Sequence, residues 1–564
     1  NFDIKRKTNF PCQIMRGRRF GLLSIFDKKD KHKNMYDILI KNGTIINGLG
    51  TPKFKGDIGI REDKIAEVGD LHNEHAEMEV DAKGKFVVPG FIDVNNHSDT
   101  YWRIFHDSYL ESMIYQGVTT IIGGNCGSSL APLVSHDVIK SIQKWTDVGK
   151  INFNWLTMSE FLAEVEKKKT AVNFGTLVGH GTLRRGFVGD EVRDISPQEM
   201  SLMKKMLTRA MKDGALGFST GLVYSHAKLA SSREIAELAE IVKKYNGVYT
   251  THIRGEGHEL IRSVEEAIRI SKDTGVRLQI SHLKAMGEKN WHLMEEAINL
   301  IETARTSGID VHFDVYPYTY TGSVLYILLP DWATEGGRSM MLSRLRDSET
   351  RRRVVKEMKE NEYDYSKITI SISSLDKTLN HKKITEIARL QGKEIEEAII
   401  DILIASEGRV VTMMDVLSEK NVDKGVVNPF SIISSNGSGY NIEHKKTGEI
   451  VHPRNFGTFP RVLADYVRER GVVGWEEAIR KMSGFPAEKF QIEKRGILKE
   501  GNYADVVVFD PQVIRDKANI EDPYQYPVGI DWVFVNGQVA VKNGLVTRAL
   551  AGDVIRRKAK LFEF

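Results

Sequence analysis

Between about residue 86 and residue 437, short apolar runs alternate with amphipathic helical stretches, and this alternation constrains the fold more than any other feature of the sequence. Such alternation is typical of βα units that build a parallel sheet. Eight runs are strand-like, so we expect an α/β fold with a closed, TIM-type (β/α)8 barrel. The expected strands are residues 86–94, 117–126, 173–180, 215–220, 248–254, 277–284, 310–318 and 431–437.

Both ends of the chain differ from this middle part. They consist of short β-rich pieces that are bounded by turn sequences such as Asn42-Gly43 and Asn536-Gly537. We therefore expect residues 35–84 and 496–564 to pair into a small β-sandwich beside a barrel formed by residues 85–495. Among the helices between the barrel strands, the one expected at 232–245 has Ser232 as its N-terminal cap.

The connection between the seventh and eighth expected strands, residues 319–430, is far longer than an ordinary loop. Loops of this length are usually functional or carry their own structure. Helical patterns at 339–361 and 393–407 favour the second possibility. We interpret the segment as an insertion that forms a lid over the catalytic face.

Charge and composition exclude several classes of protein. The net charge is +4, but residues 1–34 hold ten Lys and Arg against three Asp, so the rest of the chain carries about −3. We expect 1–34 to be a disordered basic extension and expect no nucleic-acid surface elsewhere. No apolar run approaches the ~20 residues of a membrane span, so no membrane partner is expected. The two cysteines, Cys12 and Cys126, rule out a disulfide framework and favour a cytoplasmic location.

In a (β/α)8 barrel the active site lies where the strands end, so polar residues at those ends are informative. Cys126 follows the second expected strand, and His252 and His282 end the fifth and the sixth. A thiolate with two imidazoles is a suitable three-ligand set for catalytic Zn²⁺, with a fourth position open for water. Cys126 as a nucleophile paired with a histidine is the rival interpretation. Two further residues have open roles: His180 either lines the pocket or packs a tight glycine turn, and Arg254 either supports the metal ligands from behind or is exposed or caps a helix.

Seven motifs together resemble those of the N-acyl-D-amino-acid deacylases, or D-aminoacylases, of the amidohydrolase superfamily. The resemblance runs from about Tyr36 to near the C-terminus. The motifs are residues 88–93 (VPGFID), 124–127 (GNCG), 179–181 (GHG), 217–221 (GFSTG), 251–254 (THIR), 279–284 (QISHLK) and 452–459 (HPRNFGTF).

The resemblance implies a barrel plus β-sandwich and a zinc held tightly by Cys126, His252 and His282. It also implies hydrolysis of the amide bond of a small N-acyl-D-amino acid, or a related N-acyl amino acid or dipeptide, by metal-activated water. The residues that would hold the carboxylate of this substrate are Lys284, Tyr316 and Arg454.

At two positions this sequence departs from the family. The family has a His-X-His pair after the first strand, whereas this chain has Asn95 and His97, so the weaker second metal site lacks one histidine and we expect one zinc. The family has an aspartate as general base after the eighth strand, whereas this chain has Asn436. A carboxamide cannot accept a proton from water, so we expect Asn436 to slow the chemical step more than it weakens metal binding.

Three hypotheses follow. The first is an active one-zinc amidohydrolase in which Asp99 or His97 takes the proton. The second is a pseudoenzyme that binds zinc and N-acyl amino acids or peptides without cleaving them. The third, a cyclic-amide hydrolase of the dihydroorotase or hydantoinase type, is weaker because those sites use a carboxylated lysine on the fourth strand, and residues 215–220 contain none.

Overall fold

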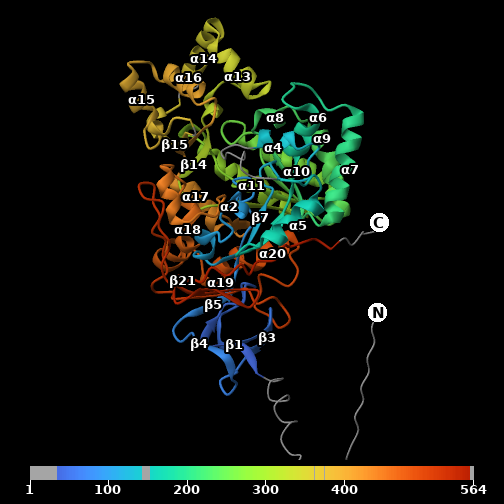
Figure 1. Cartoon of the computed structure of the whole chain (residues 1–564), viewed down its shortest axis with the longest axis vertical. Coiled ribbons are helices and arrows are strands. Elements are labelled where there is room, and N and C mark those ends of the chain that lie inside the picture. The colour runs from blue at the N-terminus through green and yellow to red at the C-terminus, as the bar shows by residue number, and fades with distance from the viewer. Residues whose placement is uncertain (1–34, 143–152, 361–362, 374, 559–564) are drawn as a thin grey trace, which may run out of the picture.

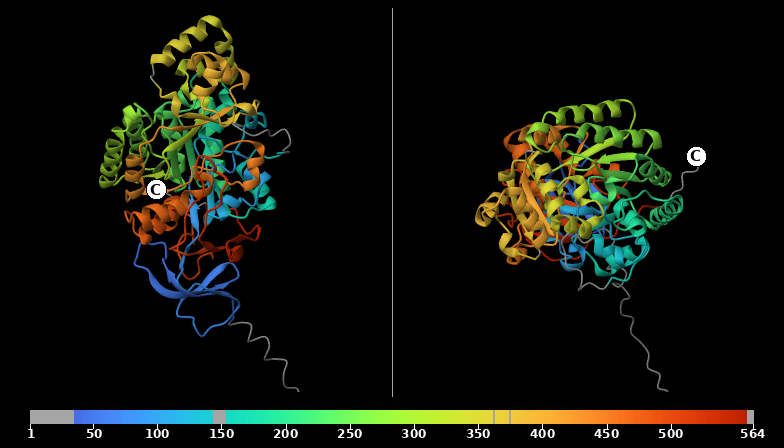
Figure 2. Two further views of the ribbon diagram at one scale, coloured as in Figure 1. Left: turned by 90° about the vertical axis from the view of Figure 1, so that its left-hand side faces the viewer. Right: turned by 90° about the horizontal axis from the view of Figure 1, so that it is seen from above.

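The computed structural model describes residues 35–142, 153–360, 363–373 and 375–558. The basic extension expected at 1–34, with Cys12, lies outside the described residues. The barrel occupies the middle of the molecule, a β-sheet lies at the lower end of Figure 1, and an insertion projects from the upper end (Figures 1 and 2). Within the described ranges, no helix combines the length and the apolar character needed to cross a membrane.

The middle of the chain forms the expected parallel barrel. Its strands pair in parallel in one order around the ring, and a parallel bridge between Asn96 and Gly437 closes it. The strands are β6 (Phe91–Asp93), β7 (Val118–Gly123), β8 (Asn173–Thr176) with β9 (Val178–Gly179), β10 (Gly217–Gly221), β11 (Val248–His252), β12 (Arg277–Ile280), β13 (Val311–Val315) and β17 (Ser431–Ile433).

Two of the expected barrel strands are interrupted. The run 86–94 divides at Gly90 into β5 (Phe86–Pro89), which joins the other sheet, and β6. Gly90 lies against β7, because a Cβ there would be 2.1 Å from Thr119 Oγ1. The run 173–180 divides at Leu177, where β8 pairs with β7 and β9 pairs with β10. An unbroken apolar run in the sequence does not reveal these changes of partner.

Helices surround the barrel, and their apolar faces bury in its outer core. Thr157 and Ser196 begin two of these helices with capping boxes. The cap of α9 is Ser231, one residue earlier than expected, because its side chain accepts the N–H of Glu234 at 3.1 Å. The main helices are α5 (Met158–Lys168), α7 (Pro197–Asp213), α9 (Ser232–Lys244), α10 (Leu260–Thr274), α11 (Leu293–Thr306) and α17 (Glu419–Val427).

Shorter helices fill the remaining connections of the barrel. They are α2 (Arg103–His106), α3 (Glu111–Ile114), α4 (Asp137–Ile142), α6 (His180–Val188), α8 (Ser225–Lys228), α18 (Arg454–Arg461), which continues into a π-helix (Val462–Glu469), α19 (Trp475–Met482) and α20 (Gly484–Phe490).

The two ends of the chain pair. Hydrogen bonds link all their strands into one nine-stranded sheet, where the sequence analysis expected a small β-sandwich. The connection between the ends is the antiparallel pair of β5 and β18. Apolar side chains from both ends, such as Ile40 and Val508, share one core. The other strands are β1 (Tyr36–Ile45), β2 (Phe54–Arg61), β3 (Lys64–Gly69), β4 (Ala76–Asp81), β18 (Val506–Phe509), β19 (Ile530–Val535), β20 (Gln538–Lys542) and β21 (Leu545–Val546).

Residues 320–415, called the insertion below, have a core of their own that includes Leu325, Leu345 and Leu403. An antiparallel sheet in the order β14-β16-β15 forms its base. Both expected helical stretches coincide with helices there. The elements are β14 (Tyr320–Val324), α12 (Asp331–Thr334), α13 (Gly337–Arg346), α14 (Ser348–Glu360), β15 (Ile368–Ser373), α15 (Ile384–Gln391), α16 (Ile395–Ala405) and β16 (Val410–Asp415).

Candidate metal centre and substrate cavity

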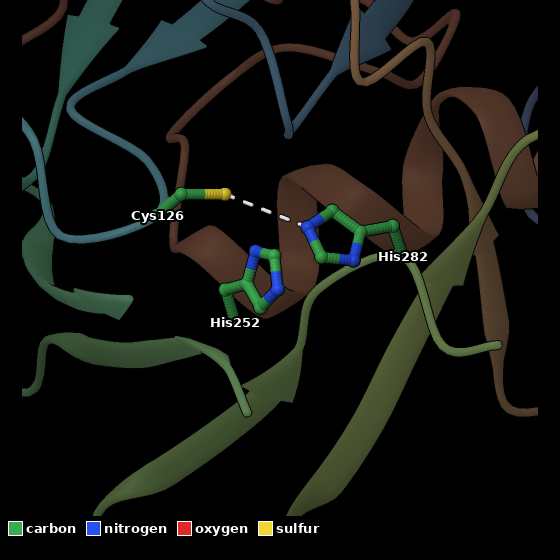
Figure 3. Close-up of side chains that lie close together, drawn as sticks. All are labelled: Cys126, His252 and His282. Carbon is green, nitrogen blue, oxygen red and sulfur yellow. Dashed lines mark hydrogen bonds between the residues drawn. The ribbon is translucent and has the colours of Figure 1, made fainter. Parts of the chain in front are cut away.

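The barrel brings Cys126, His252 and His282 together at the carboxyl ends of β7, β11 and β12 (Figure 3). One ligand atom of each lies within 4.8 Å of the other two, and all three residues are buried. Cys126 Sγ lies 3.5 Å from His282 Nε2. A buried thiol facing two imidazoles is the donor set of a catalytic zinc site, so these residues fit the expected metal.

Two of the three candidate ligands, and Asn436 after β17, have an uncommon backbone conformation. Cys126, His282 and Asn436 have φ values of 51°, 37° and 46°, in the left-handed region that non-glycine residues seldom adopt. The loop of Cys126 also lies flat on β10, because a Cβ on Gly127 would be 2.6 Å from Gly221 N. Glycine next to Cys126 therefore lets the two backbones approach this closely. Such conformations concentrate at functional sites.

Glu256, which the sequence analysis did not single out, contacts both histidines and Lys284. Its Oε1 lies 2.5 Å from Lys284 Nζ, 3.1 Å from His282 Nδ1 and 3.4 Å from His252 Nε2. Burial would raise the pKa of Glu256, but His252 and Lys284 hold this pKa well below its usual range. Glu256 is therefore a carboxylate that faces the side of His282 opposite Cys126. Its only signal in the sequence is an acidic residue four positions after His252.

The charge state of His282 suits a metal ligand. Burial, followed by the ammonium of Lys284, holds the pKa of His282 well below its usual range. Lys284 Nζ lies 2.9 Å from His282 Nδ1. The imidazole is therefore neutral, which is the form that binds metals.

A cavity extends from the metal ligands to the insertion. The barrel lines it with polar groups that include Lys284, Arg454 and Asn436. The insertion forms the opposite wall with apolar side chains, among them Val324, Ile372, Val411 and Met413, and with hydroxyl side chains such as those of Ser323 and Thr412. Residues of the insertion therefore line the cavity together with the ends of the barrel strands.

Arg454 has unused hydrogen-bonding capacity in this cavity. It is 9% exposed, and its Nε and Nη1 have no hydrogen-bond partner among the described residues. Its guanidinium carbon lies 4.8 Å from the ring centroid of Tyr316, whose buried hydroxyl likewise has no partner in the described part of the chain. Tyr316 does not line the main cavity but lines a smaller one behind Lys284. A buried guanidinium with free donors is suited to a carboxylate.

His452, which belongs to a motif but had no assigned role, fixes the start of α18. Its Nδ1 accepts the backbone N–H of Arg454 at 3.0 Å, and its Nε2 lies 3.0 Å from the carbonyl oxygen of Tyr320 in β14. Burial and the Arg454 guanidinium hold the pKa of His452 well below its usual range. A neutral ring therefore links β14 of the insertion to the backbone of Arg454.

Asn436 and His97 both line the cavity and contact each other. The Oδ1 of Asn436 accepts from His97 Nε2 at 2.9 Å. His97, an expected ligand of a second metal, is not in the close ligand group found among the described residues. Asn95, at the other second-site position, donates to Asp314 Oδ1 at 3.2 Å.

Asp99 is not among the residues that line the cavity. It is fully buried, and its Oδ2 accepts the backbone N–H of Gly124 at 2.7 Å. Burial raises the pKa of Asp99 to about 6. This placement beneath the Cys126 loop does not bring the carboxylate to the position that the sequence analysis expected for a base.

His180 and Arg254 lie in structural contacts away from the cavity lining. His180 Nε2 lies 2.7 Å from Glu234 Oε1. Arg254 binds Glu266 at 2.9 Å and donates to backbone carbonyls before α9. The structural alternative left open for each residue accounts for these contacts.

Comparison with known proteins gives one family and several close relatives. The model of the Amidohydrolase family matches residues 78–398. A D-aminoacylase of Alcaligenes xylosoxydans xylosoxydans is 34% identical over 524 residues, which cover 93% of this chain and 98% of that protein.

Two solved structures are similar over 93% of this chain and 100% of their own. One is an N-acyl-D-glutamate deacylase of Bordetella bronchiseptica complexed with zinc and a phosphonate that mimics the tetrahedral intermediate, with a TM-score of 0.77 and 29% identity. The other is a D-aminoacylase whose binuclear metal centre is described by one-metal activation and second-metal attenuation, with a TM-score of 0.79 and 32% identity.

Proposed function

The chain belongs to the amidohydrolase family, and from this premise we propose that it is a zinc-dependent hydrolase that cleaves the amide bond of N-acyl-D-amino acids. The observation that carries the proposal is the buried group of Cys126, His252 and His282 beside a cavity that contains Arg454. The convergence of both histidines on the sulfur supports Cys126 as a ligand over Cys126 as a nucleophile. The names of the similar proteins support the substrate class.

Zinc at this group would polarise the scissile carbonyl and lower the pKa of bound water. The chain itself supplies orientation and binding. Glu256 faces Nδ1 of His282 and so fixes the ring with Nε2 toward Cys126. Arg454, with two unpartnered buried nitrogens, binds the substrate carboxylate, and Lys284 lines the same cavity as a further donor. The ring of Tyr316 supports the Arg454 guanidinium from outside this cavity.

The apolar side chains that the insertion contributes to the cavity support an apolar side chain on the substrate. Val324, Ile372, Val411 and Met413 face the same space as Arg454. The Lys and Arg residues that line this cavity are Lys284 and Arg454, and Lys284 is already paired with Glu256. We therefore propose neutral, apolar N-acyl-D-amino acids as substrates in preference to N-acyl-D-glutamate or N-acyl-D-aspartate, whose second carboxylate would lack a cation.

The loss of the second-site histidine is compatible with activity, because the similar D-aminoacylase is described by one-metal activation. The missing base is the more serious change. His97 lines the cavity beside Asn436 and is the better substitute, since Asp99 lies outside it. The pseudoenzyme remains the alternative function, and the amide at Asn436 is the observation that favours it.

Turnover and metal content test the proposal together. The full chain, loaded with zinc, is assayed with N-acetyl-D-methionine, N-acetyl-L-methionine and N-acetyl-D-glutamate, and zinc is measured in parallel in the parent and in Cys126→Ala. We expect about one zinc per chain in the parent, loss of most of it in the variant, and cleavage of the D-methionine derivative above the other two. Binding of that compound without cleavage would instead identify the pseudoenzyme.

A further inference from the structure

Asn436 is followed by Gly437, and this dipeptide lies in the cavity wall. In Asn-Gly sequences the backbone nitrogen of glycine can attack the asparagine side chain of the same chain, because glycine has no Cβ to obstruct ring closure. The sequence contains six Asn-Gly pairs, at Asn42, Asn47, Asn246, Asn436, Asn536 and Asn543. The pair at Asn436 occupies the position where the family has its catalytic aspartate.

The backbone nitrogen of Gly437 has a route for its proton. It donates to Ser435 Oγ at 2.9 Å, and this hydroxyl donates in turn to Asp93 Oδ2. Asp93 is fully buried, and its Oδ1 also accepts the backbone N–H of Ser435 at 2.9 Å. A hydroxyl between an N–H group and a carboxylate is the arrangement by which a serine relays a proton to a base.

The side-chain amide of Asn436 is polarised from the opposite side. Its Oδ1 accepts from His97 Nε2 at 2.9 Å. A donor at this oxygen withdraws electrons from Cγ and stabilises negative charge that develops on the oxygen during attack, as in an oxyanion hole. The nucleophile, Gly437 N, therefore has Ser435 within hydrogen-bond distance. The amide that it would attack has His97 within hydrogen-bond distance.

We propose that Asn436 is converted to aspartate by deamidation after synthesis, and that the new carboxylate supplies the general base. The role as a base rests on the proposed deacylase function, but the modification does not. The encoded chain would then be a precursor, and its own backbone nitrogen at Gly437 would generate the general base.

The conversion balances with water as the only co-reactant. Gly437 N forms a bond to Asn436 Cγ, the Cγ–Nδ2 bond breaks, and the proton from Gly437 N leaves with Nδ2 as ammonia. This gives a succinimide. Water then adds at Cγ, and the bond between Cγ and Gly437 N breaks. This step restores the peptide N–H and leaves a carboxyl group on the side chain. Opening of the imide at the backbone carbonyl would instead give isoaspartate.

The surroundings favour the aspartate product. Asn436 lines the cavity, so water can reach Cγ. The backbone is restrained on the other side, because Gly437 O accepts the N–H of His97 at 2.7 Å in the bridge that closes the barrel. Isoaspartate would add an atom to the main chain at this bridge.

Peptide mass spectrometry of the full chain, sampled from synthesis onward, measures the acid fraction at position 436. The same chain held unfolded in urea provides the rate of the dipeptide alone, and the exposed pair Asn543-Gly544 monitors the general rate of deamidation. We expect position 436 to convert faster in the folded than in the unfolded chain, by about 10²-fold for a positioned proton acceptor. An amide that persists in the folded chain while it converts in urea would overturn the proposal.

Two serine variants separate the relay from general effects of substitution. Ser435→Ala removes the hydroxyl that accepts the Gly437 N–H, and the rate in the folded chain is expected to fall about 10²-fold, to that in urea. Ser438→Ala, in the same loop, removes a hydroxyl whose contact is with Ser98 instead, and should leave the rate unchanged. Equal rates in both folded variants and the parent would contradict the relay.

Turnover is measured separately as a function of the acid fraction. If the acid forms and turnover of N-acetyl-D-methionine rises in proportion, both proposals are supported. If the acid forms without turnover, the modification stands and the deacylase function fails. If the amide persists in the folded chain, the modification fails, and turnover by that chain still decides the deacylase function on its own.

Discussion

At the scale of single residues, the proposed zinc ligands Cys126, His252 and His282 contact side chains that would not bind the metal themselves. Glu256 lies beside His252, His282 and Lys284, and its negative charge balances the cationic lysine within the buried group. Carboxylates that contact ligating histidines orient the rings and raise their basicity. Removal of this charge should therefore weaken the metal group although no ligand is lost.

Glu256→Gln should lower the affinity for zinc about 10- to 100-fold, because it removes the carboxylate that faces Nδ1 of His282. Competition with a chelator of known affinity measures the change. Glu259→Gln, at a half-exposed glutamate three residues later, is the matched control. Equal zinc affinity in the parent and in both variants would contradict the orienting role.

Arg454→Ala should raise KM for N-acetyl-D-methionine about 10- to 100-fold, since a charged hydrogen bond contributes roughly 1.5–3 kcal/mol. Initial rates over a range of substrate concentrations measure KM. Arg461→Ala is the control from the same helix, because Arg461 pairs with Asp516 outside the cavity. An unchanged KM in Arg454→Ala would indicate a substrate without a free carboxylate.

Asn436→Asp should increase kcat for N-acetyl-D-methionine by about 10²–10⁴ over freshly made chain that still has the amide, since this is the usual contribution of a placed general base. Zinc content should not change, because Asn436 is not in the ligand group. If kcat stays the same or falls while His97→Asn abolishes activity, the base is His97 instead.

The sequence could predict Cys126, His252 and His282 because each follows an apolar run at a barrel strand end. It could not predict Glu256, because 76 acidic residues occur in the chain and only the fold shows which one reaches the histidines. Asp99 was expected to take the proton, but the turn after β6 directs its carboxylate toward the backbone N–H of Gly124. Proximity in sequence gives no side-chain direction outside regular helices and strands.

At the scale of elements, the insertion contributes one wall of the cavity and is stabilised by its own core. β14 and β15 both pair with β16, so the apolar side chains of this wall are held on an antiparallel sheet, which has a register shift between Ile370 and Ile372. Sites on such elements are positioned more precisely than sites on loops. Under the proposed function, the insertion would select the side chain of the substrate and the barrel would hold the reacting groups.

Val411→Lys should shift the preference from N-acetyl-D-methionine toward N-acetyl-D-glutamate by about tenfold in kcat/KM, because a new cation in the apolar wall can pair with the second carboxylate. Kinetics with both compounds measure the ratio. Leu390→Lys, on the outer face of α15 where Leu390 is 61% exposed, is the control. A ratio equal to that of the control would show that the side chain lies elsewhere.

The elements of the barrel were predictable from their periodicity, but their breaks were not. The divisions at Gly90 and Leu177 depend on which neighbour each half pairs with, and pairing is a long-range property. The nine-stranded sheet shows the same limit. Short strands with turn signals predict that the two ends pair, whereas the order of strands within the sheet appears only in the structure.

At the scale of the whole molecule, the last described residues bind the base of the barrel. Gly552 and Val554 bridge to Thr170 and Phe174 at the third barrel strand. Arg557 donates to the carbonyl oxygens of Asn246 at 2.6 Å and of Leu216 at 3.1 Å. These carbonyls precede β11 and β10, at the end of the barrel opposite the metal ligands.

Arg557→Ala should lower the free energy of unfolding by about 1–3 kcal/mol, because it removes a charged donor from the carbonyl oxygens of Asn246, Leu216 and Phe490. The thermal midpoint should fall while zinc content stays the same. Arg556→Ala is the adjacent control, in which only an exposed ion pair with Glu166 is lost. A midpoint equal to that of the control would show that the carbonyls find other donors.

The pairing of β5 with β18 has a consequence for synthesis on the ribosome. One edge of β5 (Phe86–Pro89) pairs with β1, but its other edge has no partner until Val506–Phe509 has been translated. At usual elongation speeds of about 5–20 residues per second, that delay is roughly 20–80 s. During this interval β5 has one unpaired edge beside the apolar faces of β1 to β5. An unpaired strand edge can pair with other chains and cause aggregation, so we expect a chaperone to protect it until the C-terminus is released.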